Sequence, residues 1–326
     1  MKALVLSAIV VTAMSAPTKT SELDSLSSAT EWINSPPLTA EGLRGKVVLV
    51  QFWTYSCINW VRTLPYAKAW ERKYRDKGLV VIGVHAPEFD FEKQLVNARW
   101  GAEYFGVGYP VAVDNDFAIW RAFGNGYWPA LYLIDGRGRV RYRHFGEENY
   151  AESERMIQEL LAEAGARGID GSLVSVNPHG AEAAADWDNA KSPETYLGSE
   201  RSENRVSSAD RPLRLNQWAL GGDWAVQRQA VVLKEANGRI VYRFQARDLN
   251  LVMTPGPQMG PVRFRVLIDG QAPGAAHGSD VDEPGNGVVA DPRMYQLIRQ
   301  PGPVRDRHFE IQFLDPGVQV FVFTFG

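Results

Sequence analysis

The hydrophobic positions early in the chain change their period twice. Lys46–Trp53 is a short apolar run with several β-branched residues, which is typical of a strand buried on both faces. From Asn59 to Lys77 apolar residues recur at helical spacing, with basic residues between them. Gly78, a common residue at the end of a helix, comes next, and Leu79–His85 is a second apolar run. The pattern predicts a strand, a helix and a second strand.

The same alternation continues to residue 165. Further helical patterns cover Phe91–Phe105, Phe117–Phe123 and Tyr150–Ala164. Ala130–Asp135 and Val140–Phe145 flank Gly136-Arg137-Gly138, which is typical of the turn of a β-hairpin. Residues 17–165 are therefore predicted to form an α/β domain, in which a parallel sheet carries an antiparallel hairpin at one end.

Composition and period both change after Gly165. Residues 166–204 are rich in Gly, Ser, Asn, Pro and charged residues, which predicts a linker. In residues 205–326 apolar and polar positions alternate with period two, most clearly in Val262–Ile268, and turn sequences separate the runs. Short alternating strands with turns at this spacing predict an antiparallel all-β sandwich.

The N-terminal 16 residues have the pattern of a secretory signal peptide. Lys2 is followed by an apolar run from Ala3 to Ala13 and then by small residues. The run is too short for a membrane anchor, which takes roughly 20 apolar residues, and no later stretch is long enough either. We therefore predict a periplasmic or secreted protein without a membrane span in the mature chain. A cytosolic protein with an apolar first strand is the alternative.

Composition and charge exclude several kinds of function. The 35 Lys and Arg residues are balanced by 38 Asp and Glu residues, so no basic excess exists for binding nucleic acid. A single cysteine excludes an internal disulfide, a cysteine-based zinc site and a dithiol redox centre within one chain. The acidic residues between Asp280 and Asp291 fit no calcium loop that we can identify. No metal and no cofactor are predicted.

The single cysteine, Cys57, lies between a predicted strand and the start of a predicted helix. Backbone N–H groups and the helix dipole at such a position stabilise a thiolate. The position predicts a reactive thiol with a pKa below the free value of about 8.5. A buried structural thiol is the alternative.

A second feature is Trp128-Pro129, just before the first strand of the hairpin. A proline cannot donate a hydrogen bond to a neighbouring strand, so it is unexpected at the entrance of a central strand. A cis Trp128–Pro129 bond would explain it, because that bond turns the chain sharply at the strand entrance. An ordinary trans turn proline is the alternative.

Together, a strand, Trp-Thr-x-x-Cys, a helix and a proline that opens a hairpin resemble the thioredoxin fold. The chain is similar to periplasmic redoxins of the TlpA/ResA type, and especially to the extracytoplasmic part of the DipZ family. The segments that carry this similarity are residues 51–66, 81–91, 109–123 and 127–135. The C-terminal extension of that family is a jelly-roll sandwich that resembles carbohydrate-binding modules, and residues 192–326 match it in kind.

The resemblance implies roles for individual residues. Cys57 stands at the nucleophilic first cysteine of a Cys-x-x-Cys pair, and Pro129 stands at the cis-proline beside the active site. Trp60 occupies the position of the resolving cysteine, so a mixed disulfide or sulfenic acid at Cys57 cannot be resolved within the chain. The predicted partner is therefore an external thiol reductant or a redox partner protein.

Thr54 carries a second resemblance, to peroxiredoxins. It precedes Cys57 by three residues, the Thr-x-x-Cys spacing of that family, in which the hydroxyl helps to polarise the peroxide. Val50 stands where that family usually has a proline, so only half of the motif is present. A one-cysteine peroxidase is therefore the alternative to thiol–disulfide exchange, and Thr54 is a third candidate catalytic residue beside Cys57 and Pro129.

Four aromatic residues around these positions are predicted to bind substrate: Trp53, Tyr55, Trp60 and Trp128. Cys57 and Trp60 are three residues apart at the start of a helix, so their side chains should share one face. We therefore expect Trp60 to form an apolar lip over the sulfur. Such a lip would exclude water, and it would hinder a protein disulfide more than a small peroxide.

Other candidates have weaker support. Arg62 could stabilise a thiolate, but a solvated helix face is the favoured interpretation, and His85 could act as a base, although a structural histidine is favoured. Asp114, Asn115 and Asp116 are predicted to form an N-cap cluster ahead of the helix that starts near Phe117, rather than a metal site. A sugar-stacking surface in the second domain, with core packing as the favoured alternative, would use Trp187, Tyr196, Trp218, Trp224 and Tyr295.

Two classes of function follow from these features. In the first, the protein is an exported thiol-dependent oxidoreductase in which Cys57 attacks a peroxide or a disulfide. In the second, it is a non-catalytic binding protein, with a degenerate redoxin groove beside Trp60 and Pro129 and a sandwich that binds a glycan or another partner. The residues favour the first class.

Overall fold

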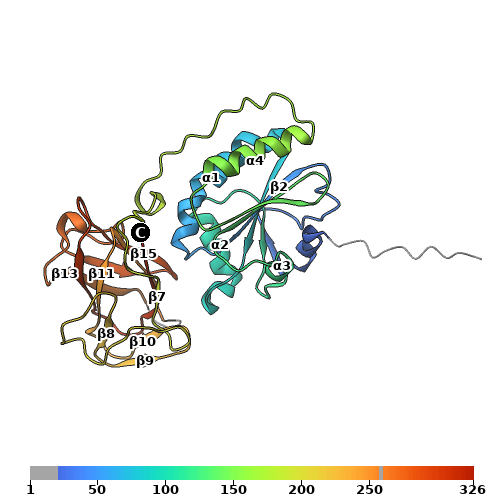
Figure 1. The fold of residues 1–326 in the computed structure, drawn as a ribbon. Helices are drawn as coiled ribbons and strands as arrows, with labels where there is room; N and C mark the ends of the chain where they lie inside the picture. Colours follow the sequence, from blue (N-terminus) through green and yellow to red (C-terminus); the bar gives the residue numbers. More distant parts are fainter. Residues whose placement is uncertain (1–20, 257–259) are drawn as a thin grey trace, which may run out of the picture.

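The computed structural model describes residues 21–256 and 260–326, which form an α/β domain and an all-β domain (Figure 1). The predicted signal peptide, residues 1–16, lies outside the described residues. Within the described part of the chain, no helix combines the length and the apolar character that crossing a membrane requires.

The first domain is built on one mixed sheet with the strand order β1-β4-β3-β2-β5-β6. β2, β3 and β4 are parallel, whereas β5, β6 and β1 pair antiparallel with their neighbours. The strands are β1 (Glu31–Ile33), β2 (Val47–Trp53), β3 (Leu79–His85), β4 (Val111–Val113), β5 (Ala130–Ile134) and β6 (Val140–Phe145). The predicted thioredoxin-like α/β fold is confirmed. The short strands β1 and β4 were not predicted.

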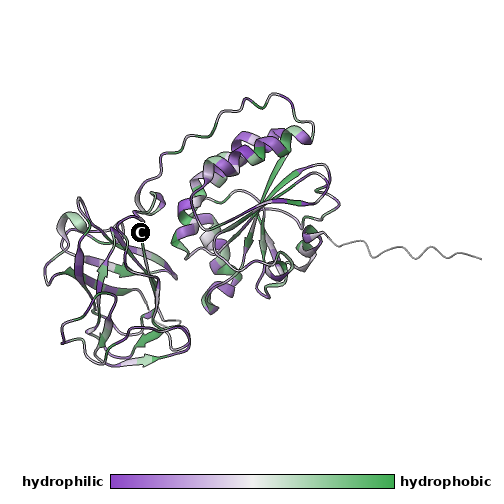
Figure 2. Ribbon diagram, in the orientation of Figure 1, coloured by the Kyte–Doolittle hydropathy of each residue, from purple (hydrophilic) through white to green (hydrophobic). Residues whose placement is uncertain are grey.

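Helices cover both faces of this sheet. They are α1 (Ile58–Tyr74), α2 (Leu95–Tyr104), α3 (Ala118–Ala122) and α4 (Tyr150–Glu163). Val47, Leu49 and Trp53 point to the face of α1, α2 and α4, while alternate residues of β2 pack towards α3. Figure 2 shows hydrophobic residues concentrated in the strands and hydrophilic ones along the outer faces of α1 and α4.

One predicted helix is shorter than the pattern indicated. A helix was expected over Phe91–Phe105, but Asp90–Lys93 is a 3-10 turn and α2 begins only at Leu95. The turn forms because Glu92 binds back to the chain: its Oε2 accepts hydrogen bonds from the N–H groups of Glu88 (2.6 Å) and Phe89 (2.9 Å). This local bonding replaces the first turn of the expected helix.

The second domain is an antiparallel sandwich, as predicted. One sheet contains β7 (Thr195–Tyr196), β9 (Trp224–Val226), β10 (Val231–Leu233), β12 (Asp248–Thr254), β15 (Arg293–Arg299) and β17 (Gln319–Phe325). The other contains β8 (Trp218–Gly221), β11 (Gly238–Gln245), β13 (Val262–Ile268), β14 (Asn286–Val289) and β16 (Asp306–Phe313). A dense apolar core lies between the two sheets.

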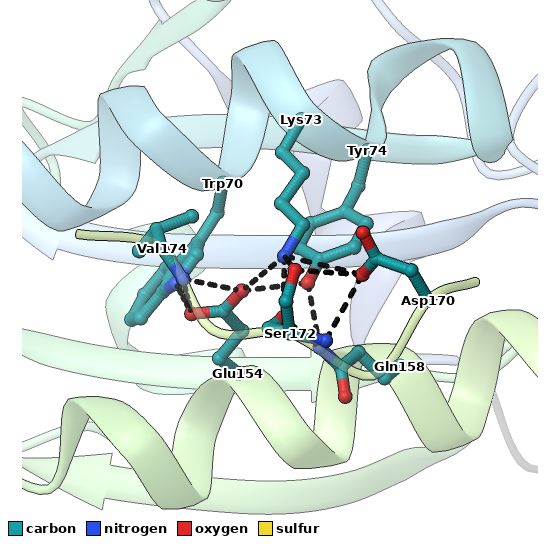
Figure 3. A network of polar contacts seen from close by, with 8 residues as sticks. All are labelled: Trp70, Lys73, Tyr74, Glu154, Gln158, Asp170, Ser172 and Val174. Carbon is teal, nitrogen blue, oxygen red and sulfur yellow. Dashed lines mark hydrogen bonds and ion pairs between the residues drawn. The ribbon is translucent and has the colours of Figure 1, made fainter.

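Residues 166–204, expected as a linker, contain two contrasting parts. After α4 the chain turns back along the first domain, where Ser172 and Val174 are fastened between α1 and α4 (Figure 3). Farther on, β7 pairs with β17, so Thr195 and Tyr196 belong to a sheet of the sandwich.

The two domains share an apolar contact. The hydrophobic cluster of the first domain continues into the second through Phe321, Val252 and Met294. The rings of Phe89 and Phe91 pack on Phe321 at centroid distances of 5.0 and 4.8 Å. The sandwich therefore buries part of its own surface against the segment between β3 and α2.

Candidate active site around Cys57

Cys57 is the residue before α1, directly after the loop that follows β2. Its side chain is partly buried, and its Sγ lies 3.8 Å from the carbonyl oxygen of Trp128. The Trp128–Pro129 peptide bond is cis, which confirms the prediction. Cys57 and Pro129 are 72 positions apart in the sequence, and β2 and β5 bring them together as antiparallel neighbours.

The electrostatic environment of Cys57 differs from the prediction. Burial raises the pKa of the Cys57 thiol above its ordinary value, and the nearby charges of Glu88 and Glu194 act in the same direction. The N–H groups of Trp60 and Asn59 lower the pKa, as expected at a helix N-terminus, but their effect is smaller. The predicted low pKa is therefore wrong for this conformation, because loss of hydration outweighs the helix dipole.

Trp60 does not form a lip over the sulfur. Its side chain has no exposed surface: the indole stacks on Trp53 at a centroid distance of 4.3 Å and meets Phe105 edge-on at 5.2 Å. Trp53 and Tyr55 are equally buried. These three rings fill the core between the sheet and the helices, because a large apolar ring gains more from packing there than at a solvated edge.

Trp128 is the one member of the predicted aromatic set that remains partly exposed. Its indole Nε1 donates a hydrogen bond to the carbonyl of Ala86 (2.9 Å), and its ring packs on Trp120. Tyr127 beside it is 59 % exposed and contacts Phe145, which is also exposed. The open side of the site is thus the surface formed by these residues next to the cis-proline.

Thr54 lies in the loop between β2 and α1, residues 54–57, which we call the thiol loop, and His85 is the last residue of β3. Neither side chain is in contact with solvent. Burial lowers the pKa of His85 to about 3, so its imidazole is neutral at physiological pH. Its ring packs between Tyr55 and Trp53. The favoured structural interpretation of His85 fits this packing, and a base that exchanges protons with a substrate does not.

No sequence pattern pointed to Glu92, which is fully buried beside the thiol loop. Its Oε1 accepts a hydrogen bond from the hydroxyl of Ser56 at 2.5 Å, and its Oε2 binds the two backbone N–H groups described above. Within the described ranges no Lys, Arg or His lies within ion-pair distance of this carboxylate. Burial therefore raises the pKa of Glu92 to about 7, although the hydrogen bond from Ser56 opposes the shift.

The second domain reaches this region through Tyr196 and Arg201. The Tyr196 hydroxyl donates to Oε1 of Glu88 at 2.7 Å, and Nη1 of Arg201 donates to the same oxygen at 2.9 Å. The Arg201 guanidinium lies 3.5 Å from the centroid of the Tyr196 ring. The same hydroxyl is 2.8 Å from a carboxylate oxygen of Glu194. Polar groups of both domains thus border the site.

Two of the weaker predictions have clear outcomes. Arg62 is not on a solvated helix face: it is 2 % exposed, pairs with Glu147 at 3.0 Å and lies under the ring of Trp187. The second domain and the chain leading to it cover this part of α1, which the helical pattern could not show. Asp114 caps α3 as predicted, because its carboxylate accepts hydrogen bonds from the N–H groups of Ile119 and Trp120.

The candidate sugar-binding aromatic residues do not share one surface. Trp218 and Tyr295 are buried, Tyr196 faces the first domain, and Trp187 lies over Arg62. The acidic residues near the turn of the second domain have local partners: Asp280 pairs with Arg293. Across the described residues, no group of three or more metal-ligating side chains is arranged to hold an ion.

Comparison with known families covers most of the chain. Residues 30–161 match the family described as Redoxin, and residues 192–326 match the family described as Thioredoxin like C-terminal domain. Both matches agree with the division into an α/β domain and a β-sandwich.

Individual relatives give the same picture. The chain is 34% identical over 317 residues to protein DipZ of Mycobacterium tuberculosis, an alignment that covers 92% of this chain and 42% of DipZ. It is 32% identical over 133 residues to the thiol-disulfide oxidoreductase YkuV of Bacillus subtilis, covering 40% of this chain and 88% of YkuV. A solved thioredoxin-like protein in the oxidized form is 31% identical, covers 41% of this chain and 90% of its own, and superposes with a TM-score of 0.38.

Proposed function

This chain belongs to the redoxin family of thioredoxin-like thiol-disulfide oxidoreductases, and we propose that it is a single-cysteine member in which Cys57 is the nucleophile. The observation that carries the proposal is the position of the only cysteine: at the start of α1, facing the carbonyl of Trp128 beside the cis-proline. The resemblance to redoxins supports Cys57 as the reacting group, because it implies a nucleophilic cysteine at this position.

The proposed reaction is thiol–disulfide exchange in two steps. The Cys57 thiolate attacks one sulfur of a substrate disulfide, forming a mixed disulfide and releasing the other sulfur as a thiolate. An external thiolate then attacks the substrate sulfur of the mixed disulfide and forms a new disulfide with it, and Cys57 leaves as a thiolate that takes up a proton. The external thiol is required because the chain has one cysteine and Trp60 fills the second position in the core.

A disulfide is favoured over a peroxide as the substrate. The two arguments for a peroxide were a Trp60 lip over the sulfur and a Thr54 hydroxyl aimed at the oxidant. Both side chains are completely buried, so neither borders the open side of the site. The exposed surface beside Pro129 instead offers Tyr127 and Phe145, which are suited to contact with a polypeptide.

Export to the periplasm or the outside of the cell is part of the proposal. The apolar run after Lys2 supports it, and so does the nature of the reaction, because stable disulfides occur in oxidising compartments. The chain spans less than half the length of DipZ. The electron donor and the partners of this chain are therefore proposed only by class: an external thiol or a redox partner protein.

The proposal is tested by incubating the protein with a small neutral disulfide and measuring the adduct by mass spectrometry. Wild type should form one mixed disulfide, which an added thiol should release, and Cys57→Ser should form none while keeping its circular dichroism spectrum. Reaction with hydrogen peroxide should be slower than reaction with the disulfide. A folded wild type that forms no adduct would support the non-catalytic binding protein instead.

Restoring the second thiol gives a further test. Trp60→Cys should create an internal disulfide, seen as the loss of both titratable thiols on oxidation, because residues three apart at a helix start lie on one face. Removing the stacked indole should also lower the free energy of unfolding by about 3–5 kcal/mol. Trp60→Ala is the matched control, with a similar cavity and no second thiol.

A further inference from the structure

One segment of the first domain touches both the thiol loop and the second domain. It runs from Ala86, after β3, to Lys93, before α2, and we refer to residues 86–93 as the bridging segment. Its backbone is anchored at the site, because the N–H of Ala86 binds the carbonyl of Trp53 and the carbonyl of Ala86 accepts from the Trp128 indole. A shift of this segment would therefore be felt by the residues around Cys57.

The side of the bridging segment that faces the thiol is held by Glu92. One oxygen of its carboxylate binds Ser56, the residue before Cys57, and the other binds the N–H groups of Glu88 and Phe89. The hydrogen bonds with Ser56 and Phe89 are buried and the one with Glu88 is partly buried, so this side chain links the residue before Cys57 to the bridging segment. Buried hydrogen bonds to a carboxylate are strong and directional, so the two loops should move together.

The other side of the bridging segment is held by the second domain. Glu88 accepts hydrogen bonds from Tyr196 and Arg201, and the N–H of Asp90 donates to the side chain of Gln229. Phe89, between them, packs on Phe321 of β17. The second domain therefore contacts the side chains of Glu88 and Phe89, the same two residues whose N–H groups bind Glu92.

We propose that the second domain is a positioning element of the Cys57 site, and that it acts through Glu88 and Glu92. This inference deepens the proposed function and rests on it for its biological meaning. Docking of the sandwich fixes Glu88 and Phe89, these residues fix Glu92, and Glu92 fixes Ser56 and with it the thiol. When the sandwich is released from the bridging segment, Cys57 becomes more hydrated.

Cys57 alkylation is a direct readout, because the chain has no other thiol. The rate with iodoacetamide is measured against pH on the full chain, which gives the pKa of the thiol as well as its accessibility. The interface variant is Tyr196→Phe/Arg201→Gln, which removes both side-chain donors to Glu88. Arg263→Gln is the matched control, since Arg263 pairs with Asp315 within the second domain.

The interface variant should shift the midpoint of the pH profile downward by about one unit, because rehydration relieves the burial that raises the thiol pKa. Loss of the Arg201 charge beside Glu88 would by itself shift the midpoint upward, so a downward shift reports rehydration of the thiol. At a pH below that midpoint, this shift corresponds to about tenfold faster alkylation. Arg263→Gln should leave the profile of the wild type unchanged. An interface variant that is folded and has the wild-type profile would overturn the proposal.

The role of Glu92 is tested by combining the interface changes with Glu92→Gln. If the effect of the interface passes through Glu92, the interface changes should alter the alkylation rate of Cys57 less than twofold at any pH when Glu92→Gln is already present. Ser56→Ala breaks the same connection from the thiol side and serves as the second background should Glu92→Gln not fold. Independent, multiplicative effects in these backgrounds would overturn the proposed route.

These outcomes are separable from a failure of the proposed function. Alkylation reports on the thiol whether or not the protein reacts with disulfides. If the interface changes alter the alkylation profile through Glu92 but no mixed disulfide forms, the redox function is refuted and the positioning role stands. If the mixed disulfide forms at equal rates in wild type and the interface variant, and their alkylation profiles are identical, the redox function is supported and the positioning role is refuted.

Discussion

Two buried carboxylates, Glu154 and Glu92, each bind a neighbouring segment of the first domain, and they differ in whether a cation lies beside them. Glu154 on α4 accepts hydrogen bonds from the Trp70 indole, the Tyr74 hydroxyl and the Val174 N–H, and Lys73 lies 3.2 Å from it (Figure 3). Glu92 also binds three donors, but within the described ranges it has no cation. Glu154 fastens the chain leading to the second domain, whereas Glu92 fastens the thiol loop.

The difference teaches how each site responds to pH. A buried carboxylate beside an ammonium group keeps its negative charge at little cost, whereas one without a cation favours the neutral form. Accordingly, the pKa of Glu92 is raised to about 7. The Glu92 carboxylate, which holds the thiol loop, is therefore a group whose charge a change of pH can alter.

Removal of Glu154 is expected to have the largest effect. Glu154→Ala leaves the Trp70 indole, the Tyr74 hydroxyl and the Val174 N–H without their acceptor, so the free energy of unfolding should fall by about 3–5 kcal/mol. Limited proteolysis should then cut in residues 166–180, which lose their anchor. Glu159→Ala, at an exposed position of the same helix, should change neither the free energy of unfolding nor the proteolysis pattern. An uncut variant would show that other contacts hold this segment.

The pH dependence at Glu92 is the next largest effect. A carboxyl group whose pKa is raised from 4.5 to about 7 on folding holds its proton in the folded state after the unfolded chain has released it. Glu92 therefore contributes a fall in stability of on the order of 3 kcal/mol as pH rises from about 4.5 to about 7, and Glu194, whose pKa burial also raises to about 7, adds to the slope. Denaturant titrations at several pH values measure this slope. Glu92→Gln should reduce the slope of stability against pH. An equal slope in wild type and the variant would contradict the contribution of Glu92.

Removing the cation beside Glu154 should have a smaller effect. Lys73→Met leaves the Glu154 carboxylate buried without its cation, so stability at pH 7 should fall by about 1–2 kcal/mol. Lys46→Met, at an exposed position, is the control. A Lys73→Met variant as stable as wild type would mean that this ion pair does not contribute to stability.

Ser56→Ala should have the smallest effect. It removes one of three donors to Glu92, which should cost about 1 kcal/mol at pH 7 and raise the pKa of Glu92 further. The slope of stability against pH should therefore extend to a higher pH than in wild type. If the slope instead ends at a lower pH than in wild type, the Ser56 hydroxyl does not stabilise the ionised Glu92 carboxylate.

Local sequence patterns were sufficient for much of the fold. β3 and β6 have the predicted bounds, and Gly78, with a φ of +102°, ends the 3-10 turn Arg75–Lys77 that follows α1, as a glycine can at no steric cost. β12 was missed, because all seven of its residues are buried and include Asp248 and Asn250. A strand covered on both sides carries no alternating pattern to detect.

The sequence by itself determined the positions of Cys57 and Pro129, because a strand–helix junction and a proline at a strand entrance are local features. Only the tertiary structure decided the electrostatics of the thiol and the fate of Trp60, Arg62 and Glu92. Burial depends on which segments pack against a residue, and the charges of Glu88 and Glu194 act on Cys57 from segments far apart in the sequence. Desolvation and Coulomb interactions act through space, so a pattern along the chain cannot reveal them.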